Sequence, residues 1–256
     1  PTAGPKYSTL ADLKSTPHTY HLVDTEEKRI ELGRFLNEQD FFAFDTETDS
    51  VDALNAGLVG MSFAVKENEA WYVPVPANSV EVAKVVERFS PALQNRKSLK
   101  IGQNIKFDIL VVRKYGIRIA GPLFDTMIAH YLLNPELRHG MDYLAEIYLK
   151  YKTVRIEELL GPKGRKQLTM RDVPIPLVCE YAAEDADITL KLKNYFAPLL
   201  EKERLESLFY DIEMPLVYVL AEMEYTGVTL DTVALKQSSK ELTIALKELE
   251  KEIYEL

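Results

Sequence analysis

Short apolar runs alternate with stretches of helical periodicity between residues 18 and 200. Runs rich in β-branched and aromatic residues predict strands at residues 18–24, 41–44, 58–65, 69–76 and 99–104. Apolar residues three or four apart predict helices at residues 25–38, 79–89, 105–116, 124–133, 141–150 and 177–200. Thr25 and Ser79 stand where N-caps are expected. Strands interleaved with helices in this way predict a mixed α/β domain.

The pattern changes near residue 203, where we place a domain boundary. Residues 1–17 are polar and predict a linker, residues 18–203 form the α/β domain, and residues 204–256 are helical with a bend at Pro215. Apolar residues then recur three or four apart at Leu235, Leu242, Leu246, Leu249, Ile253 and Leu256. We expect this seam to pack on the preceding helix or to pair weakly with a second copy, and a solvated tail is the alternative.

The stretch FAFDTETDS, residues 42–50, runs from apolar residues directly into alternating acids. Side chains of a strand alternate between its faces, so Asp45 and Glu47 point the same way and Thr46 points opposite. Two neighbouring carboxylates raise each other's pKa unless a cation lies between them. A charged turn in water would explain the same residues. A Ca²⁺ loop is another reading, but the EF-hand spacing is absent.

Two later stretches favour a site over a turn. In GQNIKFD, Asn104 and Asp108 are four residues apart at the start of a predicted helix and therefore share a face. In EYAAEDAD, Tyr181 and Asp185 share one face of another helix in the same way. These two pairs shift the interpretation of the acids at residues 45–49 from a charged turn towards a functional site.

Other polar residues in these stretches have simpler interpretations. Glu184 and Asp187 lie off the helix face that carries Tyr181, so we expect their side chains to be solvated or to cap a helix end. Asp125, in FDTM, precedes a predicted helix and is expected to be its N-cap. Cys179 is expected to be a core residue.

The motifs DTET, NIKFD and YAAED, in this order, resemble the exonuclease motifs of the proofreading domain of bacterial family A DNA polymerases, the DNA polymerase I group. The flanks KIGQNIKFD, FDTM, RHGMDYLAE and KGRKQLT extend the resemblance over nearly the whole chain. MPLVYVLAEMEYTGV resembles the beginning of the polymerase domain, its thumb, and we expect this chain not to polymerise DNA. The resemblance implies an RNase H-like fold, a mixed β-sheet flanked by helices, followed by an α-helical segment.

The resemblance implies a role for each matching carboxylate. Asp45, Glu47 and Asp185 would bind a first divalent metal ion, and Asp45 would bridge to a second ion that Asp108 holds through water. Tyr181 would orient the attacking water together with Glu47. The cofactors would be two Mg²⁺ ions, with Mn²⁺ as a substitute, because both accept oxygen ligands. Two such ions, ~3.5–4 Å apart, stabilise the attacking and leaving oxygens of phosphodiester hydrolysis.

The resemblance also implies contacts to the single-stranded 3′ end of DNA from Gln103, Asn104 and Arg138. Phe107 stands where some relatives have tyrosine, so a hydroxyl contact is missing there. Val51 stands where a leucine wedges between the last bases, and a shorter wedge is expected. Ile156 replaces an aromatic residue that stacks on a base, which predicts a lower affinity for single strands.

Charge and composition limit how the protein can bind nucleic acid and where in the cell it can be expected. The net charge of −9 argues against a protein that coats nucleic acid along its whole surface, but allows one that handles a strand end where metal ions supply positive charge. The single cysteine excludes an internal disulfide and indicates a reducing cytoplasm. No apolar run approaches the ~20 residues of a membrane span, so we expect no membrane partner.

The leading hypothesis is a 3′–5′ exonuclease that hydrolyses DNA by a two-metal mechanism, as the proofreading part of a DNA polymerase I. A catalytically silent structural module of a polymerase is one alternative, although all four carboxylates of the motifs are present. An exoribonuclease of the RNase D type is another alternative. The flanking motifs and the polymerase-like final segment argue against it.

Overall fold

The computed structural model describes residues 10–162, 164 and 167–255. The chain divides into two compact units, residues 1–222 and residues 223–256. The domain boundary expected near residue 203 stays a prediction. Part of the expected N-terminal linker is ordered, because strand β1, Ala11–Asp12, pairs in parallel with β8, Tyr151–Lys152.

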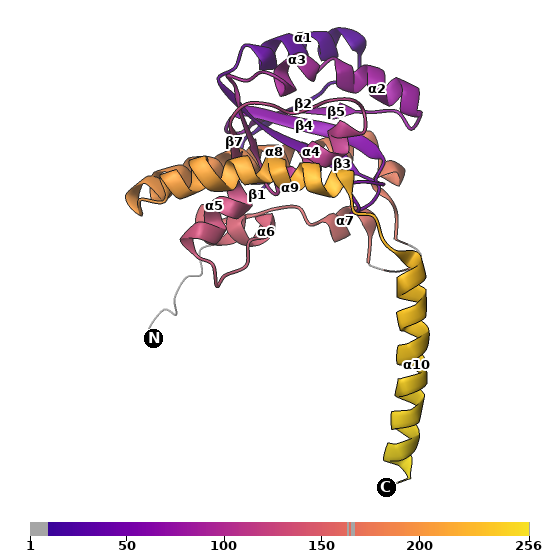
Figure 1. Cartoon of the computed structure of the whole chain (residues 1–256). Coiled ribbons are helices and arrows are strands. Elements are labelled where there is room, and N and C mark those ends of the chain that lie inside the picture. Colours follow the sequence, from indigo (N-terminus) through magenta and orange to yellow (C-terminus); the bar gives the residue numbers. More distant parts are fainter. Residues whose placement is uncertain (1–9, 163, 165–166, 256) are drawn as a thin grey trace, which may run out of the picture. The chain divides into compact units, whose positions relative to one another are not determined.

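A mixed sheet forms the centre of the first unit (Figure 1), with the strand order β2-β5-β4-β3-β6-β7. Its strands are β2 Thr19–Leu22, β3 Phe41–Thr48, β4 Leu58–Lys66, β5 Glu69–Pro74, β6 Leu99–Gly102 and β7 Leu123–Asp125. The pairs β3–β4 and β4–β5 are antiparallel, and the outer pairs are parallel. The predicted strands are all present, and the mixed α/β fold is confirmed.

The helices of the first unit surround this sheet. They are α1 Glu26–Asn37, α2 Ser79–Glu87, α3 Ser90–Leu93, α4 Ile105–Arg113, α5 Thr126–Leu133, α6 Met141–Leu144, α7 Ile156–Leu160 and α8 Ile175–Lys202. Thr25 caps α1 as predicted, but α2 is capped by Asn78, whose side chain accepts from the N–H of Val80. The predicted helix over residues 141–150 is divided, because α6 continues as the π-helical turn η1, Ala145–Leu149.

The register of the three central strands separates small residues from aromatic ones. Ala43, Ala64 and Ala70 lie opposite one another on one face, and helix α8 packs against these three strands. Phe44 pairs with Phe63 on the other face, where Phe63 stacks on Phe89 with ring centroids 5.1 Å apart. Helices α1, α2 and α3 cover that aromatic face (Figure 1). The small residues therefore let the long helix approach the strand that carries the acids.

The chain leaves the α/β layers through an interrupted helix. A 3₁₀ turn, η2 Met170–Asp172, precedes α8, and a π-helical turn, η3 Leu208–Glu213, precedes α9, Met214–Thr226. Pro215 lies in the first turn of α9. The bend predicted at this proline corresponds to the π-helical turn η3, which ends just before α9 begins. Phe209, in η3, is fully buried and contacts Phe124, with ring centroids 4.8 Å apart.

The second unit contains the end of α9 and one further helix, α10, Thr232–Tyr254. The side chain of Asp231 caps α10 by accepting from the N–H groups of Val233 and Ala234, as predicted. All described residues of α10 are exposed, including Leu235, Leu242, Leu246, Leu249 and Ile253 of the apolar seam, whereas Leu256 lies outside the described residues. The pairing of this seam with a second copy stays a prediction. Across the described residues, no helix is both long enough and apolar enough to span a membrane.

Candidate metal centre

Three carboxylates from two elements converge at the end of the sheet. Asp45 and Glu47 project from β3 and Asp185 projects from α8, and one carboxylate oxygen of each lies within 4.8 Å of the others. The strand alternation explains how the first two reach the same partner. The register of β3 with β4 shifts between Glu47 and Thr48, so a bulge ends regular pairing next to the site.

The electrostatics of this cluster are unfavourable without a cation. Burial raises the pKa of Asp45 to about 7. Burial and the charge of Asp45 raise the pKa of Glu47, and burial with the charges of Asp45 and Glu47 raises that of Asp185. Glu47 Oε1 is buried without a hydrogen-bond partner among the described residues. Clustered carboxylate oxygens with an unsatisfied lone pair fit a hard divalent cation.

Asp108 lies beside this group on helix α4, and it is almost fully buried. Its Oδ1 accepts from the backbone N–H of Thr46 at 3.0 Å and from the Thr46 hydroxyl at 2.6 Å. Burial and the charge of Asp45 raise its pKa. Thr46, the residue between the two strand acids, therefore ties the fourth carboxylate to the strand that carries the first two.

Asp125 is the residue that places α4. It caps α5, as predicted, by accepting from the N–H groups of Met127 and Ile128. It also accepts from the N–H groups of Asn104 and Ile105 at the start of α4. One buried carboxylate thus satisfies backbone donors of two helices and fixes the end of α4 from which Asp108 projects.

Tyr181 lies one turn before Asp185 on α8 and is partly buried. The charge of Asp185 and burial raise its pKa, and Glu47 and Asp45 add to this effect. Its phenol is therefore in the electric field of all three clustered carboxylates and stays protonated at neutral pH.

The residues expected to contact DNA have different surroundings. Val51 is 96% exposed, and Asn104 and Arg138 are also exposed. Phe107 is partly buried against the core. Gln103 is tied internally, because its Nε2 donates to the carbonyl of His139 at 2.7 Å and its Oε1 accepts from the Thr126 hydroxyl.

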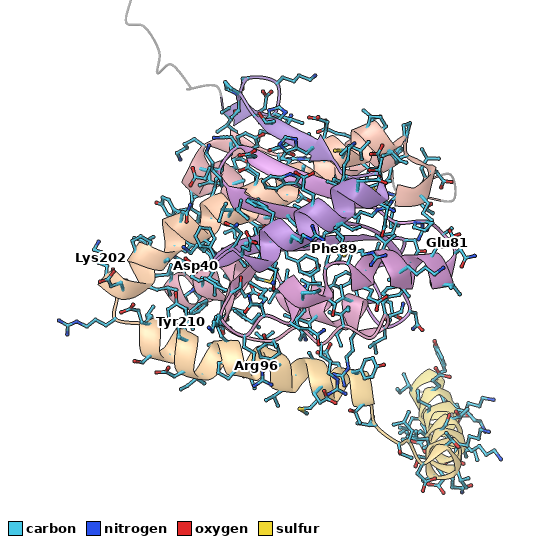
Figure 2. All side chains as sticks on the ribbon, turned by 90° about the horizontal axis from the view of Figure 1, so that it is seen from above. Asp40, Glu81, Phe89, Arg96, Lys202 and Tyr210 are labelled. Carbon is cyan, nitrogen blue, oxygen red and sulfur yellow. The ribbon has the colours of Figure 1, made fainter. Side chains whose placement is uncertain are left out.

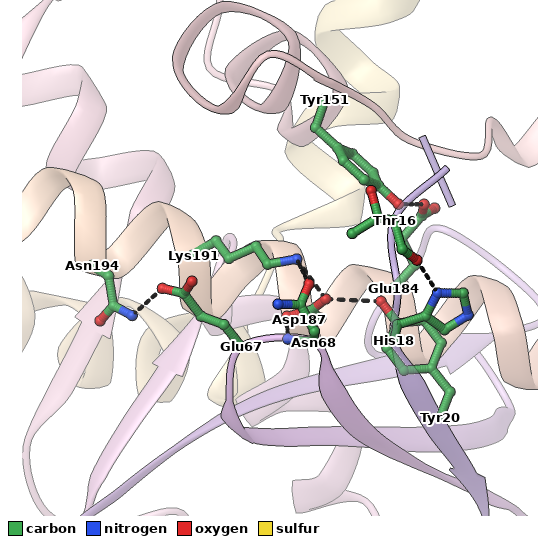
Figure 3. Close-up of polar contacts among 10 residues, drawn as sticks. All are labelled: Thr16, His18, Tyr20, Glu67, Asn68, Tyr151, Glu184, Asp187, Lys191 and Asn194. Carbon is green, nitrogen blue, oxygen red and sulfur yellow. Dashed lines mark hydrogen bonds and ion pairs between the residues drawn. The ribbon is translucent and has the colours of Figure 1, made fainter. Parts of the chain in front are cut away.

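The expectation that Glu184 and Asp187 are solvated or capping is wrong, because both are buried (Figure 3). Glu184 accepts from the Tyr151 hydroxyl at 2.7 Å and from the N–H of Val154 at 2.8 Å. Asp187 accepts, each at 2.8 Å, from the Tyr20 hydroxyl, the Asn68 N–H and the Lys191 ammonium. Residues 182–190 of α8 are all buried, so acids that lie off the face of Tyr181 are still inside the fold.

Fold and site together define an RNase H-like domain with a carboxylate site for divalent cations. Residues 20–201 match the 3′–5′ exonuclease family of DNA polymerase A, and the chain belongs to this family. The resemblance of the motifs is thereby confirmed, as is the 3′–5′ exonuclease that it implied. Exonucleases of this kind use divalent metal ions, in agreement with the acidic cluster.

Two bacterial relatives support this membership. DNA polymerase I of Pseudomonas aeruginosa is 43% identical over 231 residues, which cover 86% of this chain and 25% of the relative. DNA polymerase I of Borreliella burgdorferi is 34% identical over 237 residues, which cover 91% of this chain and 26% of the relative. The chain thus spans about a quarter of the length of these relatives.

A solved structure shows the same fold. The POL domain of Pol1 from M. smegmatis, in complex with DNA primer-template and dNTP, superposes with a TM-score of 0.71 at 18% identity. The match covers 89% of this chain and 36% of that one. At this identity the comparison concerns the fold alone.

Proposed function

We propose that this domain hydrolyses DNA from a single-stranded 3′ end and serves as the proofreading part of a DNA polymerase I. The observation that carries the proposal is the convergence of Asp45, Glu47 and Asp185 around a buried, unpaired carboxylate oxygen, in a chain of the 3′–5′ exonuclease family. Nothing in the geometry favours a silent module, because the carboxylates are together and uncompensated.

In this proposal the three clustered carboxylates would hold a first Mg²⁺ ion, and Asp45 and Asp108 would hold a second. Mn²⁺ takes the same oxygen ligands. Bound divalent cations supply the positive charge that stabilises the attacking and leaving oxygens of the phosphodiester.

The protein's own groups position the attacking water. The Tyr181 hydroxyl can donate a hydrogen bond to the water, because a phenol is protonated at neutral pH and the charge of Asp185 and burial raise its pKa further. Glu47 can accept one from the same water through its free oxygen. Burial of this region limits competing solvent and fixes both groups before substrate arrives.

Three exposed residues and the partly buried Phe107 supply the contacts to the strand. Arg138 pairs with a phosphate, Asn104 donates to the backbone or a base, and Val51 and Phe107 pack against the terminal bases. Gln103 contributes by holding the carbonyl of His139, and with it the segment that carries Arg138.

A 5′-labelled single-stranded DNA tests the proposal. The chain with Mg²⁺ is expected to give a ladder of products shortened from the 3′ end, and Asp185→Ala is expected to be slower by at least ~10³-fold. Asp40→Asn, at an exposed residue just before β3, is the matched control and should cut at the full rate. Absence of cleavage by the unsubstituted chain would favour the silent module. Preferential cleavage of an RNA of the same sequence would favour the exoribonuclease.

A further inference from the structure

Tyr72 of β5 belongs to the face of the sheet that carries the metal-binding acids. Asp45 lies opposite Ser62 on β4, and Ser62 lies opposite Tyr72 on β5. Residues directly opposite one another in antiparallel strands point to the same side. A row of three side chains therefore leads from Asp45 across the sheet to Tyr72, which is only 1% exposed.

The phenol of Tyr72 leans along the sheet toward Glu47. Gly60 is the residue opposite Glu47. A Cβ atom added to Gly60 would lie 2.3 Å from both Cε2 and the hydroxyl oxygen of Tyr72. The ring thus occupies the space that any side chain at Gly60 would need, and its hydroxyl end is beside the strand residue opposite Glu47.

Packing connects the same ring to the helix on the other side of the site. Tyr72 lies in a hydrophobic cluster with Val178, Cys179 and Ala182 of α8, and Tyr181 packs against that cluster. Burial, followed by the charge of Glu47, raises the pKa of Tyr72, so its hydroxyl is a neutral donor at physiological pH. Tyr72 is therefore placed between the strand that holds Glu47 and the helix that holds Tyr181.

We propose that Tyr72 is a positioning residue of the exonuclease, whose hydroxyl donates to the Glu47 carboxylate when that carboxylate turns to receive the cation and the attacking water. The inference rests on the function proposed above. It also assigns a role to Gly60, because only glycine leaves room for the ring at this place. A hydrogen bond to the charged carboxylate, made as the cation binds, stabilises the metal-bound arrangement, so both the affinity for the cation and the rate depend on the hydroxyl.

Tyr72→Phe removes the hydroxyl and keeps the ring, and Gly60→Ala keeps the hydroxyl but displaces the ring. Tyr218→Phe is the matched control, because that hydroxyl donates to the carbonyl of Gly121, at 2.9 Å, away from the acids. Calorimetry of Mn²⁺ binding, single-turnover hydrolysis of single-stranded DNA at saturating Mn²⁺, and thermal melting are measured for each. Tyr72→Phe and Gly60→Ala are expected to weaken Mn²⁺ binding and slow hydrolysis by about tenfold each, in line with a hydrogen bond to a charged group. Tyr218→Phe is expected to change neither.

Four results separate the possibilities. Unchanged Mn²⁺ affinity and rate in Tyr72→Phe would overturn the inference, and so would a lower melting temperature without a change in Mn²⁺ affinity, since that marks a purely structural role. Failure of Gly60→Ala to fold leaves the decision with Tyr72→Phe. Absence of hydrolysis by the unsubstituted chain would refute the proposed function instead, and the Mn²⁺ affinities would still decide the role of Tyr72.

Discussion

Without metal, ionised Asp45 should destabilise the folded protein, and the effect should grow with pH. Burial raises its pKa from 3.8 to about 7, so the folded state holds this proton more tightly than the unfolded chain does. The stability that protonated Asp45 supplies is complete below the pKa of this group in the unfolded chain, 3.8. It is lost as the pH rises through the pKa of the folded protein, about 7. At about 1.4 kcal/mol per pKa unit, the loss is under about 2 kcal/mol near pH 5 and reaches about 4 kcal/mol near pH 8.

Asp45→Asn removes this charge with little change of shape. Urea unfolding in the presence of EDTA should therefore show a gain of up to about 4 kcal/mol in the free energy of unfolding near pH 8, and less than half of that near pH 5. Asp40→Asn provides the control, because Asp40 is exposed on the surface of the same domain (Figure 2), and its effect should stay within about 0.5 kcal/mol.

Mg²⁺ should reverse the order of the two proteins near pH 8. The cation neutralises the acids of the unsubstituted chain and binds the folded state, whereas Asp45→Asn has lost a ligand. Equal gains for Asp45→Asn at both pH values, or a gain no larger than that of Asp40→Asn, would refute the reasoning that uncompensated carboxylates oppose folding here.

Three further outcomes are expected. Tyr181→Phe should slow single-turnover hydrolysis by ~10–100-fold and leave the calorimetric Mn²⁺ affinity unchanged, because the hydroxyl orients water; a collapse of that affinity would contradict the role. Asp187→Asn should lower the free energy of unfolding in urea by about 1–3 kcal/mol, because three partly buried donors lose a buried, charged acceptor, and an unchanged value would make the network dispensable. In sedimentation, the double substitution Leu242→Glu and Leu249→Glu should abolish concentration-dependent pairing of the chain; a monomer at all concentrations before substitution would show that the α10 seam stays solvated.

The sequence predicts the longer elements well because their periodicity is strong. The apolar run after Asp40 and the helix that contains Asp185 are both visible as patterns, and both were found. Strands β1, β7 and β8 were missed because each is two or three residues long, too short for alternation to appear. Such strands exist only through the partners that the folded chain brings to them.

Some residues of the candidate site follow from local sequence patterns, and others depend on the folded chain. Strand alternation placed Asp45 and Glu47 together, and helix spacing placed Asp185 beside Tyr181, so local geometry was sufficient there. The burial of Asp187 depends on how completely α8 is surrounded, which no local pattern records. Tyr72 escaped notice because its position follows from the register of three strands and from the absence of a side chain at residue 60.

Location of the cations with a DNA end in place tests the central claim most directly. A crystal of the chain with Mn²⁺ and a short single-stranded oligonucleotide, measured at the manganese absorption edge, would reveal bound metal by anomalous scattering. One peak is expected among the carboxylates of Asp45, Glu47 and Asp185, a second on the side of Asp108, and the 3′-terminal phosphodiester against both. Peaks elsewhere, or a strand bound by its 5′ end, would contradict the assignment of this cluster as the centre of a 3′–5′ exonuclease.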